Sequence, residues 1–368
     1  MIGFLIGGLF ITASFFLKFS FPIDIRSGHH MWFSLFSFVI ILITGKPSKK
    51  SWPLVYFLFA SFLIPSNFYN GYTFLQWLPQ SLAVILYLKL ENITLDRKFL
   101  EKLFAYCCLV QAAWVLVDKA GFDIYGTILG SVFDGVQKTT KAGVPWNEKA
   151  VTGSLGHPTL SGAYMGILLP FVYRLKKYLI FLPVLAIHYT QSSMAALTAY
   201  VVILYIATYD SRFKYHLFFC HCVALALLLH HGNTHGGFFS DSARLEFWRV
   251  ALAKHGLASP VFGNGPGFIE IAGVQLSKNS EVLRPEHNEI LTLYFQYGLI
   301  GIAILIYIIR LKVVEFYKEK DVYFKGALVG LVFNSLGNFP LHIASTGTIF
   351  IILVSQLNKE KKHGGISF

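Results

Sequence analysis

Apolar residues form long runs along almost the whole chain, separated by short polar segments. A helix needs roughly 20 apolar residues to cross the hydrocarbon core of a bilayer, and runs near that length recur about twelve times. They centre on 2–18, 31–45, 52–66, 73–90, 100–118, 156–173, 178–190, 192–209, 214–231, 287–310, 323–339 and 341–357. The pattern predicts an all-α, polytopic integral membrane protein, with residues 1–368 forming a single transmembrane domain.

Two connections between the predicted helices are much longer than the others, at 119–155 and 232–286. Loops of this length in a compact domain are usually functional or disordered, and neither is of low complexity. The second loop contains a helix-like stretch, DSARLEFWRVALAKHG, followed by PVFGNGPGF, which is rich in turn residues. We therefore expect the second loop to be partly helical and to carry functional residues.

Composition agrees with a membrane protein. The chain is 55% hydrophobic and 14% charged, whereas a soluble domain carries about 25% charged residues. The net charge of +12 does not indicate a nucleic-acid partner, because the basic residues lie in short clusters between apolar runs. The first apolar run lacks a basic leader and a cleavage site, so we expect it to be a retained helix.

The clusters also predict an orientation. With a cytoplasmic N-terminus and about twelve spans, every short cytoplasmic segment carries Lys or Arg, as the positive-inside rule requires. Both termini would then be cytoplasmic, and both long loops would lie on the outer face.

Cofactor signatures are missing from the sequence. The four cysteines lie within apolar runs, and the histidines of 216–235 lack the spacing of a metal site. The chain contains no Walker or Rossmann fingerprint. We therefore predict neither a metal nor another cofactor.

The clearest candidate site is RPEHNEILTLYFQYGLIG, residues 284–301, where polar residues directly precede an apolar helix. Helical projection places one stripe of residues toward the bundle: His287, Leu291, Tyr294, Gly298 and Gly301. Histidine exchanges protons near neutral pH, so His287 is a candidate general base. The alternative is a polar helix start, where Glu286 and Glu289 favour the positive end of the helix dipole.

Arg244 and Arg284 are candidates for binding a phosphate, because the guanidinium group matches phosphate geometry. Arg244 and Trp248 share one face of the helix-like stretch, and Arg249 lies off that face. The alternative for either arginine is a solvated loop charge.

A third candidate segment, GSLGHPTLSGAYMGILLP at 153–170, enters the sixth predicted helix from the outer side. Pro158 fits a helix start, and the glycines permit close packing. His157 would then face the same region as His287. The alternative is a packing helix with an incidental histidine.

All these polar residues lie at the predicted outer boundary, and charged residues are nearly absent from the centres of the predicted spans. This placement fits chemistry on a lipid-linked substrate with its head group at the surface. An ion-coupled transporter usually keeps charged residues near the midplane, so a transporter is the remote alternative.

The spacing His287-Asn288, nine residues, Gly298, two residues, Gly301 resembles the H-[NSQ]-x9-G-x-x-G pattern of the O-antigen ligase family. That family is similar to O-antigen polymerases and to bacterial protein O-oligosaccharyltransferases. Arg244-x-x-x-Trp248 followed by Pro260-x-x-Gly263-x-Gly265 resembles the loop that precedes the histidine in these proteins, and the segment at 153–170 resembles their glycine-proline segment. The resemblance covers roughly residues 150–310.

The resemblance implies a GT-C-like, metal-independent and inverting glycan transferase of the bacterial inner membrane, active on the periplasmic face. The donor would be a glycan on undecaprenyl diphosphate, and the acceptor a hydroxyl of lipid A-core. His287 would be the catalytic base, and Arg244 and Arg284 would bind the diphosphate. The supporting residues would be Glu286, Asn288, His157, Trp248, Tyr294, Gly298 and Gly301.

Two related activities stay open: a polysaccharide polymerase and a pilin O-oligosaccharyltransferase. The second often carries further C-terminal regions, whereas this chain stops soon after its last apolar run, which favours the ligase. One residue departs from the family pattern. Met194 occupies a position at which relatives often carry an arginine.

Overall fold

The computed structural model describes residues 2–15, 25–44, 46, 71–122, 151, 153–155, 158–209, 260–263, 289–337 and 344–359. Within these ranges all regular secondary structure is helical, with ten α-helices, two short 3-10 helices and no strand. The prediction of an all-α protein is therefore confirmed. The predicted runs at 52–66 and 214–231 lie outside the described residues.

Each of the other predicted runs contains a helix. The α-helices are α1 (Ile2–Phe15), α2 (Ile25–Ile43), α4 (Gly71–Leu90), α5 (Arg97–Lys119), α6 (Pro158–Leu175), α7 (Phe181–Thr190), α8 (Ser193–Tyr209), α12 (Glu289–Lys318), α13 (Val322–Ser335) and α14 (Ala344–Ser355). The 3-10 helices are η5 (Gly153–Leu155) and η6 (Lys177–Ile180).

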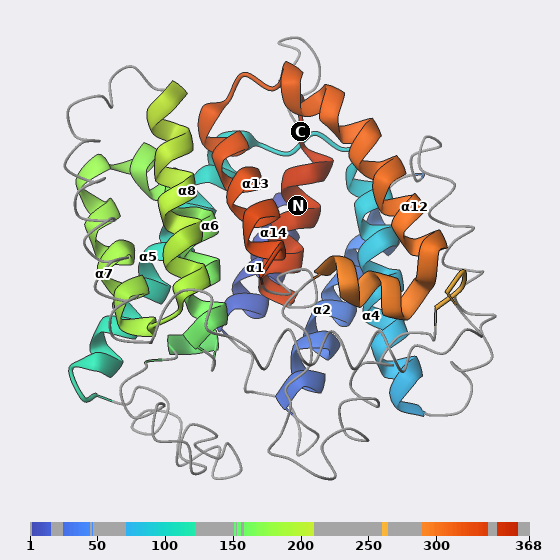
Figure 1. Ribbon diagram of the computed structural model, residues 1–368, viewed down its shortest axis with the longest axis horizontal. Coiled ribbons are helices and arrows are strands. Elements are labelled where there is room, and N and C mark those ends of the chain that lie inside the picture. The colour runs from blue at the N-terminus through green and yellow to red at the C-terminus, as the bar shows by residue number, and fades with distance from the viewer. Residues whose placement is uncertain are drawn as a thin grey trace.

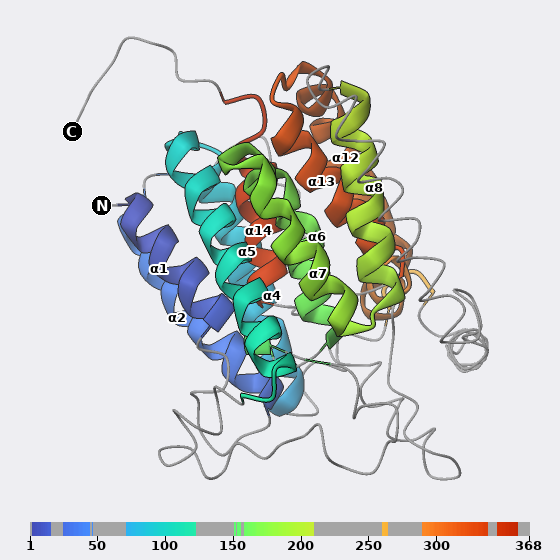
Figure 2. The ribbon, with the colours of Figure 1, turned by 90° about the vertical axis from the view of Figure 1, so that its left-hand side faces the viewer.

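The helices run alongside one another in a bundle, with α6 between α5 and α13 and also packed against α7 and α8 (Figures 1 and 2). We call one end of this bundle the network end, because the starts of α5 and α13 and the ends of α6 and α14 meet there in an ionic network. The ends of α5 and α7 and the starts of α6 and α8 lie toward the opposite end, which we call the loop end.

A chain of aromatic rings forms the centre of the bundle. Phe10 of α1 lies 5.0 Å from the ring of Phe104 and 5.9 Å from that of Tyr164. Phe171 continues the chain, 5.1 Å from Phe104 and 6.4 Å from Phe324 of α13. All five rings are fully buried, so they tie α1, α5, α6 and α13 into one core.

Glycines allow α6 to approach α8 closely. A Cβ atom on Gly162 would lie 2.5 Å from the Cβ of Ala195, and one on Gly166 would lie 3.4 Å from the Ala195 carbonyl oxygen. The predictions that α6 begins at Pro158 and that its glycines permit close packing are both confirmed. The loop-end start of α6 is thereby fixed against α8.

Among the described helices, α5 alone is both long and apolar enough to cross a membrane by itself. Several helices nevertheless expose one apolar stripe. The exposed side chains are Leu35, Phe38, Val39 and Leu42 on α2, Phe99, Tyr106, Val110 and Val117 on α5, and Leu299, Ile306, Ile309, Val313 and Tyr317 on α12. The number of transmembrane helices stays a prediction.

Candidate functional site

Most of the predicted site residues lie outside the described residues: His157, Arg244, Trp248, Arg284, Glu286, His287 and Asn288. The structure describes Tyr294, Gly298, Gly301, the PVFG part of the loop motif, and Met194. It therefore describes segments that adjoin several of the predicted site residues in the sequence.

The helix that follows His287 is broken. Gly298, inside α12, has φ 62° and ψ −156°, which no helical residue adopts. The first part of α12 therefore lies crosswise to the long second part (Figure 1). The prediction of one continuous stripe from His287 to Gly301 is wrong beyond this break, because the turn at Gly298 changes the direction in which later side chains point.

The backbone of Pro260–Gly263 fills the break. The N–H groups of Leu299 and Ile300 have lost their normal helical acceptors, and they donate instead to the carbonyl oxygens of Pro260 (2.9 Å) and Val261 (3.2 Å). The loop segment thus caps the second part of α12.

The contact between the two segments needs glycine on both sides. A Cβ atom on Gly298 would lie 2.4 Å from the Val261 carbonyl oxygen, and one on Gly263 would lie 2.4 Å from the Gln296 carbonyl oxygen. Both glycines have positive φ, 62° and 72°. Two motifs that are separate in the sequence, Pro260-x-x-Gly263 and the glycines after His287, therefore form one packed joint.

Gly301 and Tyr294 contact residues within α12 itself. A Cβ atom on Gly301 would lie 2.6 Å from the Cβ of Tyr297 and 3.3 Å from the Leu293 carbonyl oxygen, all within α12. Gly301 thus accommodates the bend within α12. Tyr294 is half-buried, with its ring 5.9 Å from that of Phe295.

Met194 packs against the end of α13. A Cβ atom on Gly337 would lie 2.7 Å from the Met194 sulfur. The Met194 carbonyl oxygen accepts a hydrogen bond from Thr198 (2.7 Å), and Thr198 accepts one from Asn334 of α13 (2.9 Å). This position therefore contributes to helix packing.

Two glutamines connect the N-terminal helices to the candidate segments. Gln111 of α5 donates to Ser161 (2.9 Å) and accepts a hydrogen bond from Ser154. Gln80 of α4 donates to Gln296 (3.4 Å) and accepts a hydrogen bond from Tyr297. Sequence reasoning missed both, because each is one polar residue within an apolar run.

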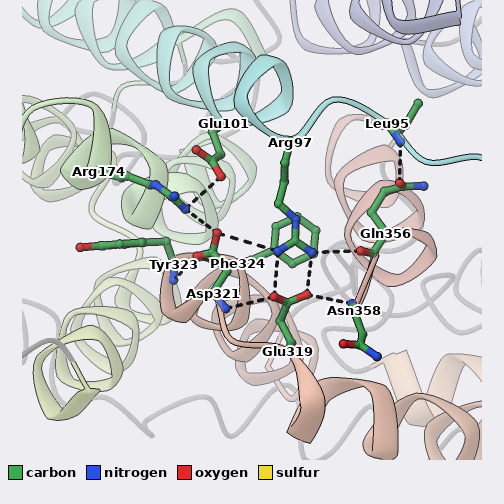
Figure 3. A network of polar contacts seen from close by, with 10 residues as sticks. All are labelled: Leu95, Arg97, Glu101, Arg174, Glu319, Asp321, Tyr323, Phe324, Gln356 and Asn358. Atoms are coloured by element: carbon green, nitrogen blue, oxygen red, sulfur yellow. Dashed lines mark hydrogen bonds and ion pairs between the residues drawn. The ribbon is translucent and has the colours of Figure 1, made fainter. Parts of the chain in front are cut away.

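The network end carries the main ionic cluster of the described residues (Figure 3). Arg97 forms a bidentate pair with Glu319, at 2.7 and 2.6 Å, and also donates to the Gln356 carbonyl oxygen (3.2 Å). Arg174 binds Glu101 (2.9 Å) and Asp321. These contacts join four chain segments that are far apart in the sequence.

The cluster perturbs the proton affinity of Glu319. Burial by itself raises the pKa of this carboxyl group. The hydrogen bonds from Arg97 and from the backbone of Asp321 and Asn358, together with the charge of Arg97, outweigh burial and hold the pKa below its ordinary value. Glu319 is therefore a buried, ionised structural group.

The pKa of Lys359 is also lowered, which for a lysine disfavours the charged form. Its ammonium group donates to the carbonyl oxygens of Leu90 (2.7 Å) and Ile93 (2.9 Å). Burial, followed by the positive charge of Lys312, lowers the pKa of Lys359 to about 8, against the opposing charges of Glu91 and Glu315. Sequence reasoning treated the basic residues here as orientation signals and missed these pairings.

No protein-family model and no curated protein matches this chain. In the part of the chain that the structure describes, no three His, Cys, Asp or Glu side chains gather as a metal would need. The functional assignment therefore depends on the motif resemblance and on the framework described above.

Proposed function

We propose that this protein is a membrane-embedded glycan ligase. It would transfer a glycan from undecaprenyl diphosphate to a lipid A-core hydroxyl on the periplasmic face of the bacterial inner membrane, in the course of lipopolysaccharide biosynthesis. The observation that carries the proposal is the joint between Pro260–Gly263 and Gly298. The two segments that resemble the O-antigen ligase family lie next to each other in the structure. Two segments that matched the family pattern only by chance would not need to be neighbours.

Two features of the described helices bear on the membrane setting and on the class of membrane protein. Apolar stripes on α2, α5 and α12 leave large hydrophobic side chains exposed on the surface of the described helices, as a lipid environment favours. The buried charged residues of the described helices and their connections are Lys312 and Glu319, and both are paired near the network end. This arrangement disfavours an ion-coupled transporter, which usually has charged residues near the midplane.

In the proposed reaction His287 removes the proton from the acceptor hydroxyl. The hydroxyl oxygen attacks the anomeric carbon as the bond to the diphosphate breaks, which inverts the sugar centre. Arg244 and Arg284 bind the leaving diphosphate, whose negative charge grows in the transition state. Because a diphosphate is a good leaving group, the mechanism requires neither a metal nor a nucleotide.

The test is deletion of the gene followed by complementation with single variants and electrophoresis of the lipopolysaccharide. His287→Ala should lower transfer by about 10²–10⁴-fold, the usual contribution of a general base. Arg244→Ala should also lower transfer, whereas Arg249→Ala is the matched control, because Arg249 lies off the predicted face. Wild-type capping by His287→Ala would refute the assigned role.

The deletion strain separates the related activities. Loss of all long-chain bands indicates the ligase. A band with one repeat unit indicates a polymerase, and unchanged lipopolysaccharide with an altered pilin mass indicates a protein transferase. Either of the last two results would replace the lipid A-core acceptor that we propose.

A further inference from the structure

We infer that Gln111 and Gln80 are positioning residues that hold the two candidate segments of the site, one glutamine for each. The expected effect of each glutamine on glycan transfer rests on the proposed function. The claim that each glutamine holds its own segment in place does not depend on it. It also gives a role to the N-terminal helices, which the family resemblance covers only as generic helices.

Gln111 holds the sequence on both sides of His157. Its amide nitrogen donates to the Ser161 hydroxyl (2.9 Å), and its amide oxygen accepts a hydrogen bond from Ser154. Gln111, Ser154 and Ser161 are all completely buried. Ser154 lies three residues before His157 and Ser161 lies four residues after it, so one amide group fixes both flanks of this histidine.

The backbone before His157 is shaped to receive that amide. Gly153 has φ 58°, and a Cβ atom there would lie 2.6 Å from the Gln111 amide nitrogen and 2.8 Å from Val115. A larger residue would push the Gly153–Leu155 turn away from α5. The glycine and the glutamine therefore act together.

Gln80 holds the first part of α12, which begins two residues after His287. Its amide nitrogen donates to Gln296 (3.4 Å), and its oxygen accepts a hydrogen bond from the Tyr297 hydroxyl. Gln296 and Tyr297 are buried and directly precede the break at Gly298. Because the break releases this part from the long helix, it needs another attachment to keep a fixed direction.

The arrangement predicts that each glutamine acts on its own segment. Replacing a buried hydrogen-bonding amide by an apolar side chain removes its hydrogen bonds and weakens the local structure. Among the described residues, the hydrogen bonds of the Gln111 side chain go to the segment around His157, and those of the Gln80 side chain go to α12. General destabilisation of the bundle would affect both segments in each variant.

The experiment is hydrogen–deuterium exchange with mass spectrometry on the purified full-length protein, with lipopolysaccharide profiles of the same variants in cells. Gln111→Leu should raise exchange of peptides covering 151–161 by about fivefold or more, with little change at 289–301. Gln80→Leu should show the reverse. Both should lower glycan transfer by about tenfold or more, as misplaced reacting groups do.

Two further variants make the result decisive. Asn334→Leu is the matched control, because it removes a buried hydrogen bond between α13 and Thr198 of α8 and none of the hydrogen bonds of the two glutamines. It should leave transfer and the exchange of both segments unchanged. If Gln111→Leu does not fold, Ser161→Ala removes one of the two hydrogen bonds and should give a smaller change at 151–161 alone.

Equal changes in both segments, or in neither, would overturn the inference. So would wild-type transfer by both glutamine variants in cells where His287→Ala is inactive. If His287→Ala itself keeps wild-type transfer, the proposed function fails, while the exchange data still decide whether each glutamine holds its segment.

Discussion

The Glu319 side chain is almost fully buried and forms a bidentate pair with Arg97. Removing one partner of a fully buried pair costs roughly 3–5 kcal/mol. Arg97 is 20% exposed and keeps Asp321 at 4.0 Å, so the cost here should be smaller. We therefore expect Glu319→Gln to lower the midpoint of thermal unfolding in detergent. Lys320→Gln, at an exposed neighbouring position, is the control and should change it little.

The same variant should change the pH dependence of stability. The folded-state pKa of Glu319 lies below the ordinary value of 4.5, so the carboxylate contributes its full stabilisation above about pH 4.5. That contribution falls as the pH drops through the lower, folded-state pKa. Glu319→Gln should therefore lose less stability on acidification than the wild-type protein, and an equal loss in both would contradict the assignment.

Lys359 should make the stability of the protein depend on pH in the alkaline range. Its pKa of about 8 in the folded protein lies below the ordinary 10.5, so the unfolded chain binds the proton more readily. This destabilisation is complete below about pH 8 and is relieved as the pH rises from there toward 10.5. Stability of the wild-type protein should therefore rise over this range relative to Lys359→Met. Lys320→Met, at an exposed site, should follow the wild-type curve.

At the scale of elements, the joint between Pro260–Gly263 and α12 depends on the absence of two Cβ atoms. Gly298→Ala and Gly263→Ala would each place a carbon 2.4 Å from backbone atoms of the other segment. Such overlap cannot be relieved by rotating a side chain, so the segments must separate. We expect either variant to lose glycan transfer, measured by lipopolysaccharide electrophoresis, while the protein still accumulates in the membrane.

Gly121→Ala is the control for backbone strain. Gly121 also has positive φ, 93°, but a Cβ atom there would meet nothing within 4 Å. It should therefore cost only the conformational strain of about 1–2 kcal/mol. Transfer by Gly298→Ala at the level of Gly121→Ala would show that the joint has no role in the activity.

The elements also show what the sequence predicts and what it does not. Apolar runs, together with the proline at 158, predict helix positions well because both signals are local. The break at Gly298 has no local signal, because a glycine in an apolar run also fits close helix packing. A broken helix differs from a closely packed one in where the N–H groups of Leu299 and Ile300 find acceptors. Here the acceptors are the carbonyl oxygens of Pro260 and Val261, far away in the sequence. The hydrogen-bond partners of Gln80 and Gln111 could not be predicted either, because they also lie far away in the sequence.

At the scale of the whole molecule, the ionic network brings together four segments that the sequence predicts to lie on the same side of the membrane, whichever side that is. The predicted cytoplasmic segments include the start of α5, the end of α6, the connection from α12 to α13 and the end of α14. Arg97, Arg174, Asp321 and Asn358 come from these four segments, and all four lie at one end of the bundle (Figure 3). An odd number of missed crossings between any two of them would have placed those segments at opposite ends.

This shared end leads to a direct test of topology. After replacement of the four cysteines, single cysteines can be placed at Ala120, exposed at the loop end, and at Lys320, exposed at the network end. In intact spheroplasts a membrane-impermeant maleimide should label the Ala120→Cys protein at once and the Lys320→Cys protein only after permeabilisation. The reverse order would place the loop end on the cytoplasmic side, away from a periplasmic acceptor. Immediate labelling of both would contradict a membrane-spanning bundle.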